Sequence, residues 1–271
     1  TASIAHYVLP ASFYLETDEA VDTKHYGKRA QVTIQQKAVE PLFDSRSGFQ
    51  IIVDLARCLG VGRYFNFTLD EANELRLKPL GAALKDLKAK GALPVGTPWK
   101  EGFAKLGTPS GKVEIASAVL ENLGYPAIPR WEAPLVSPDD KDPHSFRLIH
   151  GKQAIHTHAM TANQPYLMAI SRRYDMIRLL INRKRAEKIG LKDGDVAELK
   201  SLVGEGKIRV KLTEGLHPSC VWLPSGYGIF SKYLTTAYDQ GLSYNDFLPT
   251  LFDPAVGHAM SSEVIVQVTK A

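Results

Sequence analysis

Cysteine is scarce in this chain of 271 residues, which carries only Cys58 and Cys220. Two cysteines so far apart in the sequence exclude a disulfide framework, a CxxC redox motif and a local four-cysteine zinc or iron–sulfur site. The two thiols either pair with each other or stay free and buried, and we favour the second arrangement.

Long apolar stretches and a strong charge imbalance are also lacking. No stretch approaches the ~20 apolar residues that cross a bilayer, and residues 1–10 lack the charged and then apolar segments of a secretory signal. Lys+Arg 33 against Asp+Glu 29 give a net charge of +4, too weak to indicate a nucleic-acid partner. Hydrophobic residues at 44% and charged residues at 23% are typical of a folded protein. At ~100–200 residues per domain, the length allows one large domain or two moderate ones.

The first part of the chain mixes strand and helix patterns. Residues 31–35 alternate between polar and apolar, which predicts a strand, whereas residues 49–59 have helical apolar spacing. Ser47 is the expected N-cap of that helix, and Thr68 with Glu71 forms a capping box that starts the next one. Five prolines then fall within residues 126–143 and predict an extended connector at a domain boundary.

After this connector the sequence becomes rich in short strands. Glycine-containing turns separate the strands, and one short helix over residues 183–188 ends at Gly190. Several short strands with a single helix predict a closed barrel. The expected strands are residues 146–150, 176–181, 196–202, 207–213, 220–223 and 263–268.

A polar loop, residues 150–165, follows the first of these strands. It contains lysine, glutamine, histidine, threonine and asparagine, whose many donors suit an anionic or heteroatom-rich ligand. His156 and His158 could chelate a metal, but no neighbouring cysteine or acidic residue completes a ligand set. A solvated loop without any ligand is the alternative.

Four further positions could contact a ligand, and each also has a purely structural explanation. Asn182 lies at a strand end and suits an N-cap. Residues 224–228 place two glycines around Tyr227, which permits close backbone approach by a ligand or forms a plain turn. Lys28 could neutralise a phosphate or lie on an exposed turn. Glu16 could accept from a ligand or begin a helix.

Taken in order, these segments resemble the carboxy-terminal part of a molybdopterin oxidoreductase catalytic subunit of the dimethyl sulfoxide reductase superfamily. Within that superfamily, the sequence is most similar to the thiosulfate, polysulfide and tetrathionate reductase branch, with the arsenate reductases close by. The similar segments are residues 5–10 with Glu16 (family pattern ADxVLPxxxxxE), 37–41 (KAVxP), 108–117 (TPSGKxExxS), 150–153, 161–165, 181–195, 213–218 and 224–228.

The resemblance implies an α/β segment followed by a mainly β double-psi β-barrel. Residues 1–125 would be the C-terminal remainder of an α/β domain, residues 126–143 a Pro-rich linker, and residues 144–271 the molybdopterin-dinucleotide-binding barrel. The family's cysteine-rich iron–sulfur segment and its metal-ligand residue have no counterpart in this sequence. We therefore expect both in an N-terminal part outside this chain.

The resemblance also implies a cofactor and a set of residues that bind it. The family's cofactor is a pair of molybdopterin guanine dinucleotides that hold one molybdenum or tungsten. No catalytic residue and no metal ligand is expected within this chain. The implied cofactor contacts are Gly151, Lys152, Gln153, His156, Thr157, His158, Asn182, Tyr227, Asn245, Lys28 and Glu16.

The expected function is that of the cofactor-binding part of a molybdenum or tungsten oxidoreductase that reduces thiosulfate, polysulfide or tetrathionate. The alternatives are a free-standing dinucleotide-binding module or small subunit, the same part of an arsenate reductase or formate dehydrogenase, and a barrel interaction domain without a cofactor. The expected partners are the N-terminal remainder of the same subunit, an iron–sulfur electron-transfer subunit and a membrane anchor. The resemblance implies a membrane-associated complex outside the cytoplasm, and a location in the cytoplasm is the alternative. The chain alone is expected to show no turnover.

Overall fold

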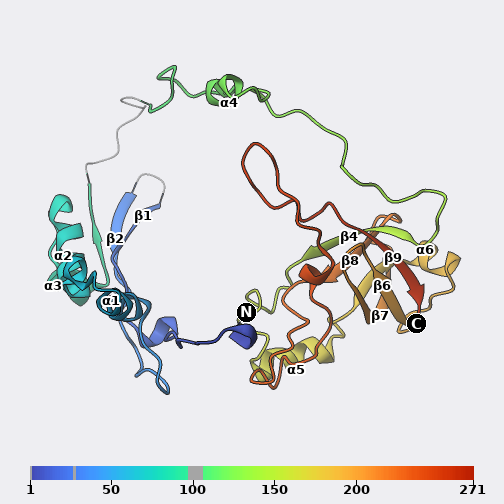
Figure 1. Cartoon of the computed structure of the whole chain (residues 1–271), viewed down its shortest axis with the longest axis horizontal. Coiled ribbons are helices and arrows are strands. Elements are labelled where there is room, and N and C mark those ends of the chain that lie inside the picture. Colours follow the sequence, from blue (N-terminus) through green and yellow to red (C-terminus); the bar gives the residue numbers. More distant parts are fainter. Residues whose placement is uncertain (1, 27–28, 97–105) are drawn as a thin grey trace. The chain divides into compact units, whose positions relative to one another are not determined.

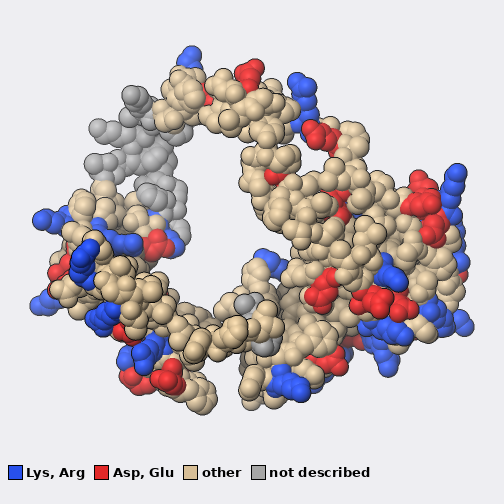
Figure 2. Space-filling model, viewed as in Figure 1, with Lys and Arg blue, Asp and Glu red and all other residues tan. Residues whose placement is uncertain are grey.

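The computed structural model describes residues 2–26, 29–96 and 106–271, which form two compact units, Thr1–Leu106 and Gly107–Ala271 (Figure 1). On the face seen in Figure 2, basic and acidic side chains lie interspersed over both units. Within the described ranges, the structure contains no helix that is both long and apolar enough to cross a membrane. The domain limits expected at residues 126–143 stay a prediction.

In its described residues, the first unit combines a three-stranded antiparallel sheet, in the order β1-β2-β3, with three α-helices. Its core forms where Val21 and Val32 of the sheet side meet Leu77, Leu84 and Leu87 of the helices. The elements are β1 (Asp22–Tyr26), β2 (Arg29–Thr33), α1 (Gly48–Cys58), α2 (Leu69–Leu77), α3 (Leu84–Lys90) and β3 (Ala92–Pro94), with 3-10 turns at Ala2–Ile4, Tyr14–Glu16, Gly62–Phe65 and Lys78–Leu80.

The helix starts expected in this unit are confirmed. The hydroxyl of Ser47 accepts a hydrogen bond from the Gln50 N–H at 3.1 Å and caps α1. The Thr68 hydroxyl accepts from the Glu71 N–H, and the Glu71 carboxylate accepts from the Thr68 N–H at 2.7 Å. This reciprocal pairing satisfies two donors that a helix start leaves free.

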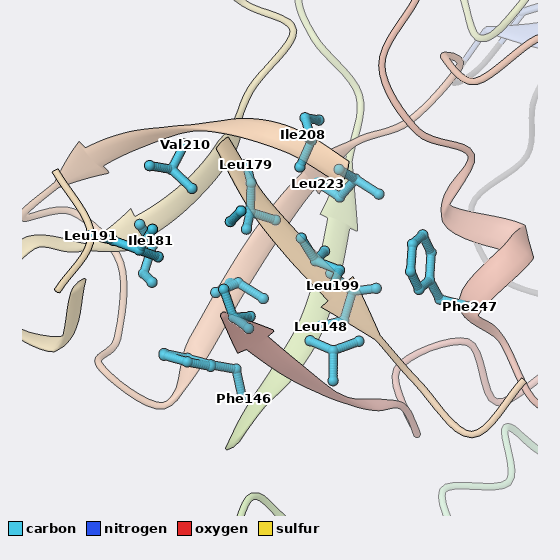
Figure 3. Packing of buried hydrophobic residues seen from close by; sticks show 14 of the residues in the cluster. Phe146, Leu148, Leu179, Ile181, Leu191, Leu199, Ile208, Val210, Leu223 and Phe247 are labelled. Carbon is cyan, nitrogen blue, oxygen red and sulfur yellow. The ribbon is translucent and has the colours of Figure 1, made fainter. Parts of the chain in front are cut away.

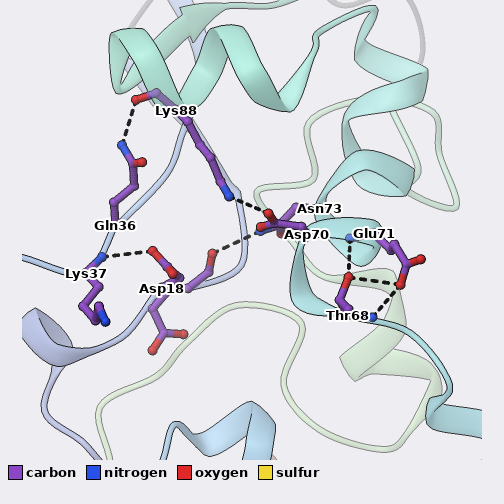
Figure 4. A network of polar contacts seen from close by, with 9 residues as sticks. Asp18, Gln36, Lys37, Thr68, Asp70, Glu71, Asn73 and Lys88 are labelled. Carbon is purple, nitrogen blue, oxygen red and sulfur yellow. Dashed lines mark hydrogen bonds and ion pairs between the residues drawn. The ribbon is translucent and has the colours of Figure 1, made fainter. Parts of the chain in front are cut away.

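A polar contact network joins α2 and α3 to the chain segments just before β1 and just after β2 (Figure 4). Asn73 is 1% exposed, and its Oδ1 accepts from the Val21 N–H at 2.9 Å. Lys88 of α3 pairs with Asp70 of α2 at 2.6 Å, and the Lys88 carbonyl accepts from the Gln36 amide. The buried asparagine therefore supplies the acceptor that the Val21 N–H needs.

The second unit is built around a closed six-stranded barrel in the order β4-β8-β5-β7-β6-β9. Strands β4 and β8 run parallel, as do β5 and β7, whereas the other neighbours are antiparallel. Short helices connect the strands. The elements are α4 (Ala118–Asn122), β4 (Ser145–Gly151), α5 (Pro165–Arg173), β5 (Leu179–Asn182), α6 (Arg183–Lys188), β6 (Val196–Lys200), β7 (Glu205–Thr213), β8 (Cys220–Pro224), the 3-10 turn Tyr244–Phe247, and β9 (Ile265–Lys270).

Alternate residues of the barrel strands point inward and fill the barrel with apolar side chains (Figure 3). Phe146 and Leu148 of β4 and Leu179 and Ile181 of β5 are all 0% exposed. Phe247, at 1% exposed, belongs to the same cluster but comes from the 3-10 turn. The period-two burial follows from the pleat of a strand, which sends successive side chains to opposite faces.

The expected barrel is confirmed, and the differences are local. Residues 183–188 form α6 as expected. The hairpin expected at residues 204–206 is present, but its link is residues 201–204, because Glu205 and Gly206 already pair with β6 as part of β7. Helix α5 was not expected, because Asn163, Gln164 and Pro165 were interpreted as part of the polar loop; the Gln164 side chain in fact caps the helix. Both cysteines are free as expected, but neither is fully buried: Cys58, in the last turn of α1, is exposed, and Cys220 is half-buried.

Candidate functional site

The candidate site lies where β4 and β8 end side by side. Because the two strands are parallel, with Gly151 opposite Pro224, the loops that follow them leave the same end of the barrel. The Gly151 carbonyl accepts from both the N–H and the hydroxyl of Ser225, each at 3.0 Å. These bonds join the loop after β8 to the end of β4.

A pocket of about 690 Å³ opens between these loops. This volume lies within the ~300–1,000 Å³ usual for small-molecule sites. The lining described by the structure carries one lysine and two histidines but no carboxylate, which suits an anionic or electron-rich ligand. The lining residues are His150, Gly151, Lys152, His158, Ala159, Ser225, Gly226, Tyr227, Gly228, Ile229, Ser243, Tyr244 and Asn245.

Two glycines allow the pocket's loops to pass close to one another. Gly226 has φ +94, and a Cβ there would lie 2.8 Å from the His158 carbonyl oxygen. Gly228 has φ +74, and a Cβ there would overlap the backbone nitrogen of Ser243. Both positions therefore require glycine for backbone conformation and for space.

Tyr244 and His150 line the pocket side by side. The two rings stack with centroids 4.0 Å apart, and the Tyr244 hydroxyl donates to backbone carbonyls at Leu148 and Ser261. Burial raises the pKa of Tyr244 to about 12. The phenol therefore stays protonated and acts as a fixed donor into the fold.

The structure brings five of the predicted site residues together in this pocket: Gly151, Lys152, His158, Tyr227 and Asn245. Two more lie directly behind them. The Tyr227 hydroxyl donates to Gln153 Oε1 at 2.7 Å and lies 3.1 Å from the Ser171 hydroxyl, which in turn lies 2.7 Å from His156 Nε2. Burial lowers the pKa of His156 and raises that of Tyr227.

The other predicted site residues do not line this pocket. Thr157 is exposed, and its N–H donates to Thr161 Oγ1. Asn182 caps α6 by accepting from the Arg185 N–H at 3.3 Å and donates to the Leu216 carbonyl at 2.9 Å. Because β5 runs antiparallel to β8, the Asn182 end of β5 lies at the opposite end of the barrel from the loop after β8.

Glu16 and Lys28 belong to the first unit. The Glu16 carboxylate is buried and accepts from the backbone N–H groups of Phe13 at 2.7 Å and Leu42 at 3.1 Å, so it holds the local chain together. It also lines a separate pocket of about 500 Å³ in that unit. Lys28 lies outside the described residues. The hypothesis that His156 and His158 bind a metal gains no support. In the described parts of the chain, no three or more His, Cys, Asp or Glu side chains come close enough together to hold a metal ion.

Sequence reasoning missed three residues that shape the site, namely His150, Ser171 and Tyr244. Ser171 is fully buried on α5, one turn after the buried Met168, and this i, i+3 spacing was the available signal.

Another pocket of the second unit, of about 530 Å³, was also missed. It is lined by Arg172, Arg178, Lys207 and Arg209 together with Asp175, whose pKa is lowered by its hydrogen bond with Arg178.

Two known families match the sequence. Residues 146–265 match the molydopterin dinucleotide binding domain, and residues 1–58 match the family described as molybdopterin oxidoreductase. The thiosulfate reductase molybdopterin-containing subunit PhsA of Salmonella typhimurium is 28% identical over 95% of this chain and 36% of its own length. A dimethyl sulfoxide/trimethylamine N-oxide reductase of Cereibacter sphaeroides is 29% identical over 86% of this chain and 33% of its own length.

A solved structure has the same fold over the whole chain. Acetylene hydratase from Pelobacter acetylenicus matches with a TM-score of 0.76 and 22% identity, covering 100% of this chain and 39% of its own. The chain thus spans about a third of the length of the relatives it matches. The double-psi barrel expected from the sequence is confirmed. The chain thus combines a molybdopterin oxidoreductase segment, residues 1–58, with a molydopterin dinucleotide-binding domain, residues 146–265.

Proposed function

We propose that this chain is the C-terminal, cofactor-binding part of a molybdenum or tungsten oxidoreductase, and that the barrel-end pocket holds a pterin of molybdopterin guanine dinucleotide. One observation carries the proposal. Five residues picked out by sequence resemblance, from three separate segments, line a single pocket inside the region that matches the dinucleotide-binding domain. Chance would not be expected to gather them.

The pocket's chemistry fits such a ligand. A pterin presents amide, amine and ring-nitrogen edges, and the attached phosphates carry negative charge. Lys152 is exposed at the rim and would offset phosphate charge, while the Asn245 amide can donate to and accept from a pterin edge. Gly226 and Gly228 leave backbone groups open to close approach.

The remaining predicted contacts are weaker parts of the proposal. The side-chain oxygens of Asn182 and Glu16 already accept backbone hydrogen bonds, and Asn182 lies at the opposite end of the barrel, so neither is proposed to contact the pterin. Contacts from Thr157 and Lys28 rest on the sequence resemblance alone.

When bound, the cofactor supplies two-electron redox chemistry, and the protein's task is binding, orientation and electrostatics. No residue of this chain is proposed to act on substrate directly. The proposed substrates of the whole enzyme are thiosulfate, polysulfide or tetrathionate, and the support is the similarity to the PhsA thiosulfate reductase subunit. The proposed partners are the N-terminal remainder of the subunit, an iron–sulfur subunit and a membrane anchor.

Titration of the 271-residue chain with released molybdopterin guanine dinucleotide tests the binding proposal, with pterin fluorescence as the readout. We expect saturable quenching by the wild-type chain. Lys152→Gln should weaken binding by about tenfold or more, since a hydrogen bond to a charged group contributes ~1.5–3 kcal/mol. Asn245→Ala removes a hydrogen bond between neutral groups, which contributes ~0.5–1.5 kcal/mol, and should weaken binding by about two- to tenfold. Lys200→Gln, at an exposed surface position, is the matched control and should bind normally. No quenching by the wild type, or equal affinity in all four proteins, refutes the proposed site.

A further inference from the structure

A buried chain of hydrogen bonds lies behind the pocket wall, and we propose that it makes His156 and Ser171 positioning residues for Tyr227 rather than cofactor contacts. His156 is 8% exposed, Ser171 0% and Tyr227 5%. Only Tyr227 of the three lines the pocket. The proposal concerns the pocket of the proposed function, but it does not depend on which ligand the pocket takes.

The chain connects three segments of the second unit. Thr161 Oγ1, in the loop after β4, lies 2.9 Å from the Thr157 backbone nitrogen and 3.2 Å from His156 Nδ1. His156 Nε2 lies 2.7 Å from the hydroxyl of Ser171 on α5, and that hydroxyl lies 3.1 Å from the Tyr227 hydroxyl. From Tyr227 the chain passes to Gln153 Oε1 at 2.7 Å, and it ends where Gln153 Nε2 meets the Met176 carbonyl.

A backbone carbonyl fixes the direction of this chain at the Gln153 end. The Met176 carbonyl can only accept, so the Gln153 amide must present Nε2 to it and Oε1 to Tyr227. The Tyr227 hydroxyl therefore donates to Gln153, and its oxygen accepts the Ser171 proton. At the other end, the Thr157 N–H can only donate, so it occupies one lone pair of Thr161 and leaves the Thr161 proton free to donate to His156 Nδ1.

The hydrogen bonds fix which ring nitrogen of neutral His156 carries the hydrogen. Ser171 donates its only proton to Tyr227, so His156 Nε2 must carry a hydrogen and donate to Ser171. In the neutral ring Nδ1 is then bare and accepts from Thr161. A charged ring would instead donate from Nδ1 to the remaining lone pair of Thr161, and burial, which lowers the pKa of His156, disfavours that charged form. His156 is therefore neutral, with its hydrogen on Nε2.

The consequence for the pocket is a fixed tyrosine. Tyr227 is held by donor and acceptor bonds at its hydroxyl, and its ring meets the His156 ring edge-on with centroids 5.7 Å apart. Gly241 packs against it, since a Cβ there would lie 3.2 Å from Tyr227 Cβ. Preorganised side chains of this kind spare a ligand the entropy of ordering them.

The tautomer of His156 tests the proposal without any cofactor, so its failure is separate from failure of the cofactor proposal. In the 271-residue chain with ¹⁵N-labelled histidine, NMR should show one histidine locked as the Nε2–H form at neutral pH. Its signals are assigned by their loss in His156→Gln. Tyr227→Phe should convert this single tautomer to a mixture, because Ser171 regains a free proton that it can turn toward His156.

Tyr166→Phe on α5 is the matched control, since Tyr166 is 79% exposed, and it should leave the tautomer unchanged. His156→Gln keeps a donor that can reach Ser171 and should retain the wild-type Tyr227 signals, whereas His156→Leu should shift them. If His156→Leu does not fold, the Tyr227→Phe comparison still decides. A charged or Nδ1–H His156 in the wild type, or an unchanged tautomer in Tyr227→Phe, overturns the proposal.

Discussion

Replacing Gly228 with alanine should separate the two loops that form the pocket. A Cβ at this position would overlap the Ser243 nitrogen and lie 2.7 Å from the Ser243 Cα, and both of these are backbone atoms that cannot rotate away. The residue also has φ +74, a conformation that costs a side-chain-bearing residue ~1–2 kcal/mol. Overpacking that forces the backbone to shift costs a further ~1–3 kcal/mol. We therefore expect a loss of ~2–5 kcal/mol in the free energy of unfolding.

Gly190→Ala supplies a matched control for the backbone conformation. Gly190 has φ +72, but a Cβ there would meet nothing within 4 Å. This variant should lose only the ~1–2 kcal/mol of the strained conformation. Urea denaturation of both variants measures the difference, and limited proteolysis should show earlier cleavage near residues 226–243 in Gly228→Ala alone. Equal losses in the two variants would mean that the close approach of these loops contributes nothing, and would refute the reasoning.

Three further outcomes follow from the structure. Lowering the pH from 7 to 5 should destabilise the second unit. The pKa of His156 is lower in the folded chain than the ~6.5 of the unfolded chain, so at pH 5 the unfolded chain binds the extra proton. His156→Gln should flatten this part of the stability–pH curve, and a variant curve identical to that of the wild type would contradict this expectation. Phe247→Ala should cost ~3–5 kcal/mol in denaturant unfolding, against little change for the 61% exposed Phe252→Ala. Asn73→Ala should cost ~1–3 kcal/mol by leaving the Val21 N–H buried without an acceptor, and a smaller loss would show that water reaches this N–H.

The barrel was largely predictable from sequence because its signals are local. Alternating apolar residues, glycine turns and the Asn182 cap each depend on a few neighbouring residues, and α6 forms over the expected residues. Helix α5 was missed because its capping residue, Gln164, also suits a polar loop. A helix cap and a ligand-binding loop draw on the same residue types.

The site was predictable only in part, for a physical reason. Residues near Gly151 and Tyr227 fall together because β4 and β8 are parallel neighbours, and that pairing joins segments far apart in the chain. Sequence reasoning placed His156 with the ligand contacts, but its ring faces Ser171 and Thr161 within the fold. Which way a loop side chain points depends on the buried partners it finds, and Ser171 lies on the helix that was not expected.

Hydrogen–deuterium exchange of the 271-residue chain, with and without released molybdopterin guanine dinucleotide, tests most directly whether the cofactor is held at this end of the barrel. Our account predicts that the cofactor slows exchange in residues 150–159, 225–229 and 243–245, and leaves the α6 end around Asn182 and Leu216 unchanged. Slower exchange around Asn182 and Leu216 with no change in the three pocket segments would contradict it.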